Sequence, residues 1–313
     1  MSIRLLGIVA VVMLATSVTA VSQNSDLARK VEEAFAAVRQ NHYEKAAALR
    51  DQGKSLFPYL EKYIQDPDER VRDFVVALVR KQTSPEALEI LGRSLEDRSA
   101  SVAEKAIEAI HAEYSCEQVK GSRSAKTGLK SYLAGKPNSA KAVLLLSCYT
   151  DDPDVLKLIV DSQKIQGTQG DGGIHHGVPF DLSVEMALAA LGNREGIVAV
   201  KAYIEKADVK NLFFILDNIK FLPNREVRLA LAELLKDKRP VYQPVSNVDF
   251  SLRVCDLAMT ALTSTDASLI TANYEKQRAY TDKELLDGYT NLKTTLEKTS
   301  RQESRTQHLT RDK

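Results

Sequence analysis

The sequence contains no tryptophan, and only 6% of its 313 residues are aromatic. Its interior must therefore be built from Leu, Ile, Val and Ala, which suits close packing of helices better than a β-sandwich. Glycine and proline are also scarce for this length, with 14 and 9 residues. Because these two residue types interrupt helices most strongly, their scarcity favours a chain that is helical over most of its length.

An excess of charge of one sign is also absent. The chain has 43 Lys and Arg against 42 Asp and Glu, a net charge of +1. Proteins that bind nucleic acids normally carry a basic face and a high isoelectric point. We therefore expect no nucleic-acid partner, although a balanced total leaves room for a local basic patch.

Sequence motifs of catalysis and nucleotide binding are missing too. We find no nucleophile elbow, P-loop, HExxH motif, EF-hand loop or dinucleotide fingerprint. The acidic residues are spread along predicted helix surfaces, where a pair of carboxylates is far more often a solvated face than an acid–base couple. We expect a protein that is not an enzyme and that holds no cofactor.

Only one long apolar run occurs, from Leu5 to Ala15, between the basic Arg4 and the small residues Val18-Thr19-Ala20. This order is typical of a secretory signal peptide, and the run is short for a membrane span. We expect residues 1–20 to be cleaved after Ala20, which leaves a secreted or periplasmic protein with no stable membrane insertion. An uncleaved N-terminal anchor and a buried helix are the alternatives.

Cysteine is limited to three residues, Cys116, Cys148 and Cys255. In an oxidising compartment an odd number leaves one thiol over. Cys116 and Cys148 each lie near the end of a predicted helix and flank one short helix, which makes them the candidate disulfide pair. The alternative is three buried thiols that behave as small apolar side chains. No Cys/His spacing suggests zinc.

Helical periodicity, in contrast, runs through nearly the whole chain. Leu27, Val31, Ala34 and Val38 follow one another at the spacings of three and four residues that form one face of a helix. Further helices are predicted at 42–51, 53–65, 68–81, 85–95, 99–114, 124–134, 138–149, 153–163, 180–192, 195–206, 209–221, 224–237, 250–263, 266–279 and 282–297. The predicted fold is all-α, with N-terminal helices in 21–163 and C-terminal helices in 180–298.

The helices repeat a pattern of an Asp or Asn turn followed by apolar residues four apart. After Asp66 these are Val71, Val75 and Val79. Thirty-one residues later Asp97 precedes the same arrangement. The apolar residues of this second copy are Val102, Ala106 and Ile110. Two later copies follow Asn224, with Val227, Leu231 and Leu235, and Asp249, with Val254, Ala258 and Leu262. A unit that cannot bury its apolar face alone stacks on its neighbours.

These units resemble HEAT repeats, including the short variant named after phycobilisome lyases. The similarity rests on Asp66-Pro67 with Val71-Arg72, on Val227-Arg228, and on the stretches 85–97 and 184–193. It implies an α-solenoid of stacked antiparallel helix pairs whose second helices line a concave face for a protein partner. It also implies that Arg72 and Arg228 form a structural ladder with the Asp of an adjoining repeat, with a partner contact as the alternative.

A Gly/His-rich loop at 164–179 separates the two groups of helices. Residues 167–179 contain five glycines and the pair His175-His176. With Asp171, these histidines are candidate metal ligands, because imidazole and carboxylate suit several divalent ions. Contact with a partner or a small ligand is a second interpretation. The third interpretation is a mobile linker with no direct role. We favour this one, because adjacent histidines on a flexible loop make a poor preformed metal site.

Two further segments depart from the helical pattern. Residues 239–249 carry two prolines and favour an extended excursion, in which Tyr242 and Gln243 are candidates for docking a peptide. Packing of this segment over a helix end is the alternative. The polar residues 299–313 predict a disordered tail.

Three functions follow from this pattern. The first is an exported scaffold or adaptor that binds a protein partner. The second is an accessory of lyase-like enzymes, which the short-repeat resemblance allows and export argues against. The third is a metal-binding or small-ligand-binding protein that acts through residues 167–179.

Overall fold

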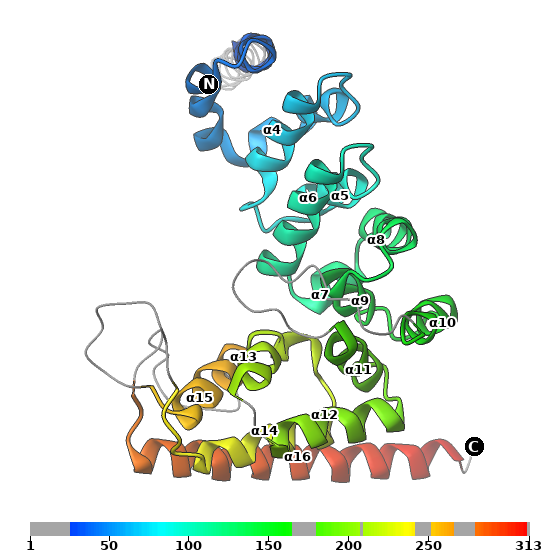
Figure 1. The fold of residues 1–313 in the computed structure, drawn as a ribbon, viewed down its shortest axis with the longest axis vertical. Helices are drawn as coiled ribbons and strands as arrows, with labels where there is room; N and C mark the ends of the chain where they lie inside the picture. Colours follow the sequence, from blue (N-terminus) through cyan, green and yellow to red (C-terminus); the bar gives the residue numbers. More distant parts are fainter. Residues whose placement is uncertain (1–25, 165–179, 207–208, 242–251, 266–278, 312–313) are drawn as a thin grey trace, which may run out of the picture. The chain divides into compact units, whose positions relative to one another are not determined.

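The computed structural model describes residues 26–164, 180–206, 209–241, 252–265 and 279–311 (Figure 1). Across these ranges the chain is helical and forms no β-strand, apart from one isolated antiparallel bridge between Pro240 and Arg253. The prediction of an all-α fold is confirmed. Within the same ranges, no helix has both the length and the apolar character needed to cross a bilayer.

The helices form two compact units. Unit 1 comprises the described residues up to Tyr114 together with Gly121–Tyr132, and unit 2 comprises Ser115–Lys120 and the described residues from Leu133 onward. The sequence predicted a division at 164–179 instead. The helices on the two sides of that segment, α10 (Pro153–Ser162) and α11 (Phe180–Ala190), pack on each other in unit 2.

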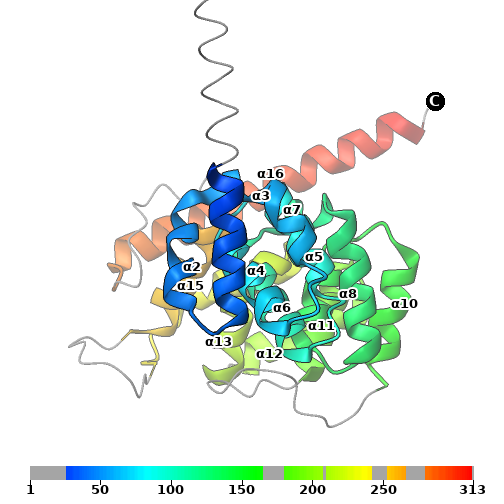
Figure 2. The same cartoon turned by 90° about the horizontal axis from the view of Figure 1, so that it is seen from above.

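Unit 1 begins with a helix over residues 26–39, which lies beside α2 and α4 (Figure 2). Its later helices are α2 (Tyr43–Ala46), η1 (Ala47–Leu56), α3 (Phe57–Leu60), η2 (Glu61–Tyr63), α4 (Glu69–Val79), α5 (Pro85–Ser94), α6 (Ala100–Glu113) and most of α8 (Arg123–Gly135). Two continuous helices were predicted over 42–65. The chain there forms short α and 3₁₀ turns instead. Gly53, with a φ of +54°, makes a kink at the predicted boundary between the two helices.

Unit 2 contains α7 (Cys116–Lys120), α9 (Ala140–Leu146), α10, α11, α12 (Arg194–Lys206), α13 (Val209–Asp217), η3 (Ile219–Phe221), α14 (Arg225–Glu233), η4 (Leu234–Lys236), α15 (Val254–Thr265) and α16 (Asp282–Arg311). Its buried centre is α11, which packs on α9, α10 and α12. Helices α12, α14 and α16 lie side by side in Figure 1, with α14 in contact with both others.

Side-chain caps set the starts of several helices where the sequence placed its breaks. Asp68 accepts a hydrogen bond from the Arg70 amide, and Ser84 accepts one from the Ala87 amide. Asp152 and Asn224 cap α10 and α14 in the same way. Such caps satisfy amide groups that have no partner inside the helix, and each contributes about 0.5–2 kcal/mol.

The repeated apolar positions form the core, as predicted. Val71, Val75 and Val79 in α4 are all 0% exposed, and so are the matching residues of α6. The later copies in α14 and α15 are likewise buried, at 2% exposure or less. Full burial of such a side chain stabilises the fold by about 1.5–3 kcal/mol. The apolar residues spaced four apart therefore belong to the buried core of each unit.

Several polar contacts inside each unit join residues 31 or 32 positions apart in the sequence. In unit 1 the side chains of Tyr63 and Glu32 bond across 31 positions, and those of Lys105 and Asp73 bond across 32. The Tyr114 hydroxyl donates to the Gln82 carbonyl, again 32 positions away. In unit 2, Arg194 and Glu226 pair across 32 positions. Contacts between residues 31 or 32 positions apart therefore occur inside both units.

Two helical regions differ from the sequence prediction. The short helix α7 was not predicted, because its five residues contain too little periodicity to detect. Helix α16 continues to Arg311, so the prediction of a disordered tail from residue 299 is wrong for residues 299–311. No glycine or proline follows Gly288 in α16, so nothing in the sequence there stops the helix.

Candidate functional site

Five of the residues singled out from sequence lie outside the described parts of the structure. They are the candidate metal ligands Asp171, His175 and His176 and the candidate docking residues Tyr242 and Gln243. Around the second pair, only the flanks are described: the Val241 amide donates to the Leu252 carbonyl at 2.7 Å, and the Val254 amide to the Arg239 carbonyl at 3.0 Å. These flanks are extended and paired with each other.

Arg228, the remaining candidate for partner contact, lies on α14 with its guanidinium turned toward its own unit. Its Nε donates to the Leu222 carbonyl at 3.1 Å, and its Nη1 lies 3.5 Å from the Thr265 hydroxyl. Both bonds fasten the start of α14 to neighbouring turns. This arrangement agrees better with a structural role than with an exposed contact.

A hollow lies in unit 1, where the turns that precede α4 and α6 meet the end of α5. We call it the ladder groove. It is half open to solvent, with a volume of about 670 Å³. Its lining is mostly charged and consists of Glu61, Ile64, Gln65, Asp66, Arg72, Arg93, Glu96, Asp97 and Arg98.

A buried ion pair forms the floor of the groove. Arg72 donates to both carboxylate oxygens of Asp97, at 2.7 and 3.0 Å, and to the Asp66 carbonyl at 2.7 Å. The side chains of Arg72 and Asp97 are each 5% exposed. The hydrogen bond to Asp97 raises the pKa of Arg72. The ladder implied for Arg72 by the family resemblance is therefore present between α4 and the turn before α6.

A matching ion pair lies earlier in unit 1. Arg39 at the end of the first helix donates to the buried carboxylate of Asp66 at 2.5 Å. Asp66 and Asp97 also accept hydrogen bonds from the amides two residues further on, Asp68 and Ser99, at 2.9 and 2.7 Å. Each aspartate thus shapes its own turn and receives an arginine from a helix 25 to 27 positions earlier in the chain.

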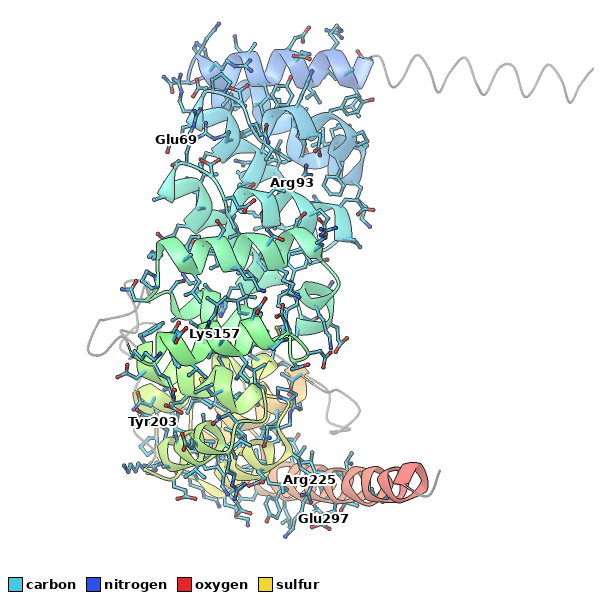
Figure 3. All side chains as sticks on the ribbon, turned by 90° about the vertical axis from the view of Figure 1, so that its right-hand side faces the viewer. Glu69, Arg93, Lys157, Tyr203, Arg225 and Glu297 are labelled. Atoms are coloured by element: carbon cyan, nitrogen blue, oxygen red, sulfur yellow. A yellow bond between two sulfur atoms is a disulfide. The ribbon has the colours of Figure 1, made fainter. Side chains whose placement is uncertain are left out.

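The rim of the groove carries a second, more exposed pair. Arg93 on α5, labelled in Figure 3, donates to both carboxylate oxygens of Glu61. This hydrogen bonding raises the pKa of Arg93 and lowers that of Glu61. A surface pair of this kind contributes little stability, about 0–1 kcal/mol. It keeps the rim polar and holds both side chains in place.

Two charged groups of the groove keep unused hydrogen-bonding capacity. Among the described residues, no hydrogen bond or ion pair engages the exposed carboxylate of Glu96. The exposed Arg98 donates one bond, from Nη2 to the Pro67 carbonyl at 2.6 Å. A guanidinium has five N–H donors, so most of its capacity remains available. Glu96 and Arg98 therefore present opposite charges two residues apart.

Sequence reasoning identified the Arg72 and Asp97 positions but missed Glu61, Arg93, Glu96 and Arg98 as one site. The signal that would have found the rim is its spacing. Glu61 and Arg93 are 32 positions apart, close to the 31-residue step between Asp66 and Asp97. Residues one repeat apart face each other when helix pairs stack.

Within the described ranges, no group of three or more His, Cys, Asp or Glu side chains is arranged to hold a metal ion. The ladder groove itself alternates acids with arginines, and an ion-paired carboxylate is already satisfied by its guanidinium. Its geometry therefore suits recognition of polar or charged groups of a partner.

Comparison of the chain with protein-family models, with curated proteins and with solved structures finds no match.

Proposed function

We propose that this protein is an exported α-solenoid of the HEAT type that serves as a non-catalytic scaffold for a protein partner. The observation that carries the proposal is the recurrence of contacts 30–33 positions apart, from Glu32–Tyr63 and Glu89–Ser122 in unit 1 to Arg194–Glu226 in unit 2. Helix pairs that stack through the same positions are the building blocks of repeat proteins, whose extended surfaces bind partners.

The aspartate–arginine rungs support the same assignment. Both pairs, Asp66 with Arg39 and Asp97 with Arg72, occupy equivalent places in two successive proposed repeats of unit 1. Each pair joins a helix of one repeat to the turn of the next. A ladder of this kind is what the HEAT resemblance implies, and it orders the turns that form the ladder groove.

The ladder groove is the proposed partner site. Its floor is internally neutralised by Arg72 and Asp97, which leaves Glu96 and Arg98 as the groups a partner can address. A peptide that places a basic side chain at Glu96 and an acceptor at Arg98 would match both charges. Such rim contacts provide register and specificity more than affinity.

Export agrees with the cysteine chemistry. Cys116 and Cys148 are joined by a disulfide in the structure, with their Cα atoms 5.1 Å apart. Structural disulfides persist in oxidising compartments and are rare in the cytosol. The proposed signal peptide, residues 1–20, lies outside the described residues.

The proposal is tested by crosslinking and mass spectrometry in the native compartment, at native expression. The informative variant is Glu96→Lys, which reverses an exposed groove charge without breaking any bond of the described fold. The matched control is Glu195→Lys, an exposed glutamate of α12 in unit 2. A partner that crosslinks to wild type and control but not to Glu96→Lys supports both scaffold and groove.

Two other outcomes count against the proposal in different ways. A partner retained equally by all three proteins would remove the ladder groove as its site and keep the scaffold. If no partner is recovered from any of them, the scaffold itself is contradicted, and ligand binding through residues 167–179 becomes the better hypothesis.

A further inference from the structure

Helix α7 occupies an unusual place in the chain. Its segment, Ser115–Lys120, belongs to unit 2, whereas the residues immediately before it and after it, Tyr114 and Gly121, belong to unit 1. The chain therefore leaves unit 1 for six residues and returns. A helix of five residues is far below the length at which an isolated helix is stable, so α7 depends on what holds it.

Both ends of this segment are fixed in unit 1. The Tyr114 side chain is 1% exposed, and its hydroxyl donates to the Gln82 carbonyl at 2.6 Å. Burial raises the pKa of Tyr114 to about 12, so the hydroxyl remains a donor at neutral pH. On the other side, the Ser122 hydroxyl donates to the Glu89 carboxylate at 2.6 Å and caps α8 by accepting from the Ala125 amide.

Three contacts hold α7 within unit 2. The first is the disulfide between Cys116 and Cys148. The second is the Tyr149 hydroxyl, which donates to the Val119 carbonyl at 2.7 Å. The third is the ion pair of Lys120 with Asp151 at 2.9 Å, whose side chains are 45% and 82% exposed and which is therefore weak.

The covalent bond differs from the other two contacts because it alone can be switched chemically. Without it, α7 is held by one neutral hydrogen bond, one exposed ion pair and the buried side chain of Val119. The loss of conformational entropy when a short segment becomes ordered opposes the formation of α7 and offsets these contacts. The disulfide removes most of that loss, because it confines α7 near unit 2 even when the helix opens.

We propose that the Cys116–Cys148 disulfide is a redox-controlled fastener whose reduction releases α7 from unit 2. This inference does not depend on the scaffold proposal. The reductant is a dithiol. One of its thiolates attacks Sγ of Cys116, the more exposed of the two residues, and Cys148 leaves as a thiolate and takes up a proton.

The second thiol of the reductant, as its thiolate, then attacks the reductant's own sulfur in the mixed disulfide, and Cys116 leaves as a thiolate and takes up a proton. The dithiol has lost two electrons and two protons and has become a disulfide, and the protein has gained two thiols. The third cysteine stays out of this exchange. Cys255 is 0% exposed, and burial raises its pKa, which keeps it as an unreactive thiol.

Hydrogen–deuterium exchange of the full chain tests the proposal, with and without dithiothreitol and in a Cys116→Ser variant. We expect amide exchange in 115–120 to rise at least tenfold on reduction and equally in Cys116→Ser without reductant. Exchange in α4, α6 and α11 is expected to stay unchanged. Reoxidation should restore the original rate. Cys255→Ser is the matched control, because it must respond to reduction as wild type does.

Two results would overturn the fastener. Unchanged exchange in 115–120 after complete reduction would mean that Val119 and Tyr149 hold α7 alone. A rise that spreads over all of unit 2 would make the disulfide a general support of that unit. If Cys116→Ser does not fold, the reduced wild-type protein still decides between these outcomes. Trypsin provides a second readout, since release of α7 should accelerate cleavage after Lys120.

Discussion

The guanidinium of Arg72 and the carboxylate of Asp97 share two hydrogen bonds, of 2.7 and 3.0 Å, from positions 25 residues apart. Each side chain is 5% exposed, so the pair is held almost out of water. A buried pair of this kind adds modest stability, but removal of one partner leaves an uncompensated buried charge.

Replacement of Arg72 by Leu should therefore destabilise unit 1 by about 3–5 kcal/mol, because Asp97 is left buried without its guanidinium. Urea unfolding followed by circular dichroism measures the change. The double variant Arg72→Leu/Asp97→Leu should recover a substantial part of the loss. A single variant as stable as wild type would show that water reaches Asp97, contrary to the geometry of the groove.

Acid stability should depend on Asp256, which is 0% exposed in α15. Burial alone would raise its pKa, but hydrogen bonds from Arg253 and from the Tyr280 amide outweigh burial and lower the pKa. A carboxylate with a lowered folded pKa stabilises fully above its unfolded pKa of about 3.9, and this contribution is lost as pH falls through the folded value.

We expect Asp256→Asn to be less stable than wild type at neutral pH and to lose less stability as the pH falls below about 4. Denaturant midpoints across this range measure the effect. Asp287→Asn, which changes an exposed carboxylate of α16, should keep the wild-type pH dependence. Parallel pH curves for wild type and Asp256→Asn would contradict the assignment.

The contact between α5 and α8 depends on the absence of a side chain at Gly92. A Cβ added there would lie 2.8 Å from the Ala125 Cα, and backbone cannot give way as a flexible side chain can. Gly92→Ala should cost about 1–3 kcal/mol, measured by thermal or urea unfolding. In Gly135→Ala the new methyl group meets nothing within 4 Å, so this variant should be neutral or slightly stabilising.

Core packing should be much more sensitive than exposed apolar surface. Leu91 in α5 is 0% exposed, and its replacement by Ala should cost about 2–5 kcal/mol because a cavity remains. Leu286 in α16 is 62% exposed, and the same replacement should change stability by no more than about 0.5 kcal/mol. Equal effects in the two leucine variants would refute the burial assigned to α5.

The sequence by itself determined most of the local structure. Apolar residues four apart, as in Val71, Val75 and Val79, fix which face of a helix is buried, because the helical period is set by the backbone. Caps such as Ser84 and Asn224 fix where helices begin, because they satisfy amides within three residues. These effects act between residues close in sequence, so they can be predicted from a single sequence.

Tertiary structure decided which residues far apart in the sequence meet. The partners of Arg93 and Tyr114 are 32 positions away in sequence, and only the packing of the helices of unit 1 brings them together. Helix α7 is too short to be predicted from sequence periodicity, and it is held by its contacts with Cys148 and Tyr149. The division into two units likewise depends on long-range packing, because no local signal near Tyr114 or Tyr132 marks it.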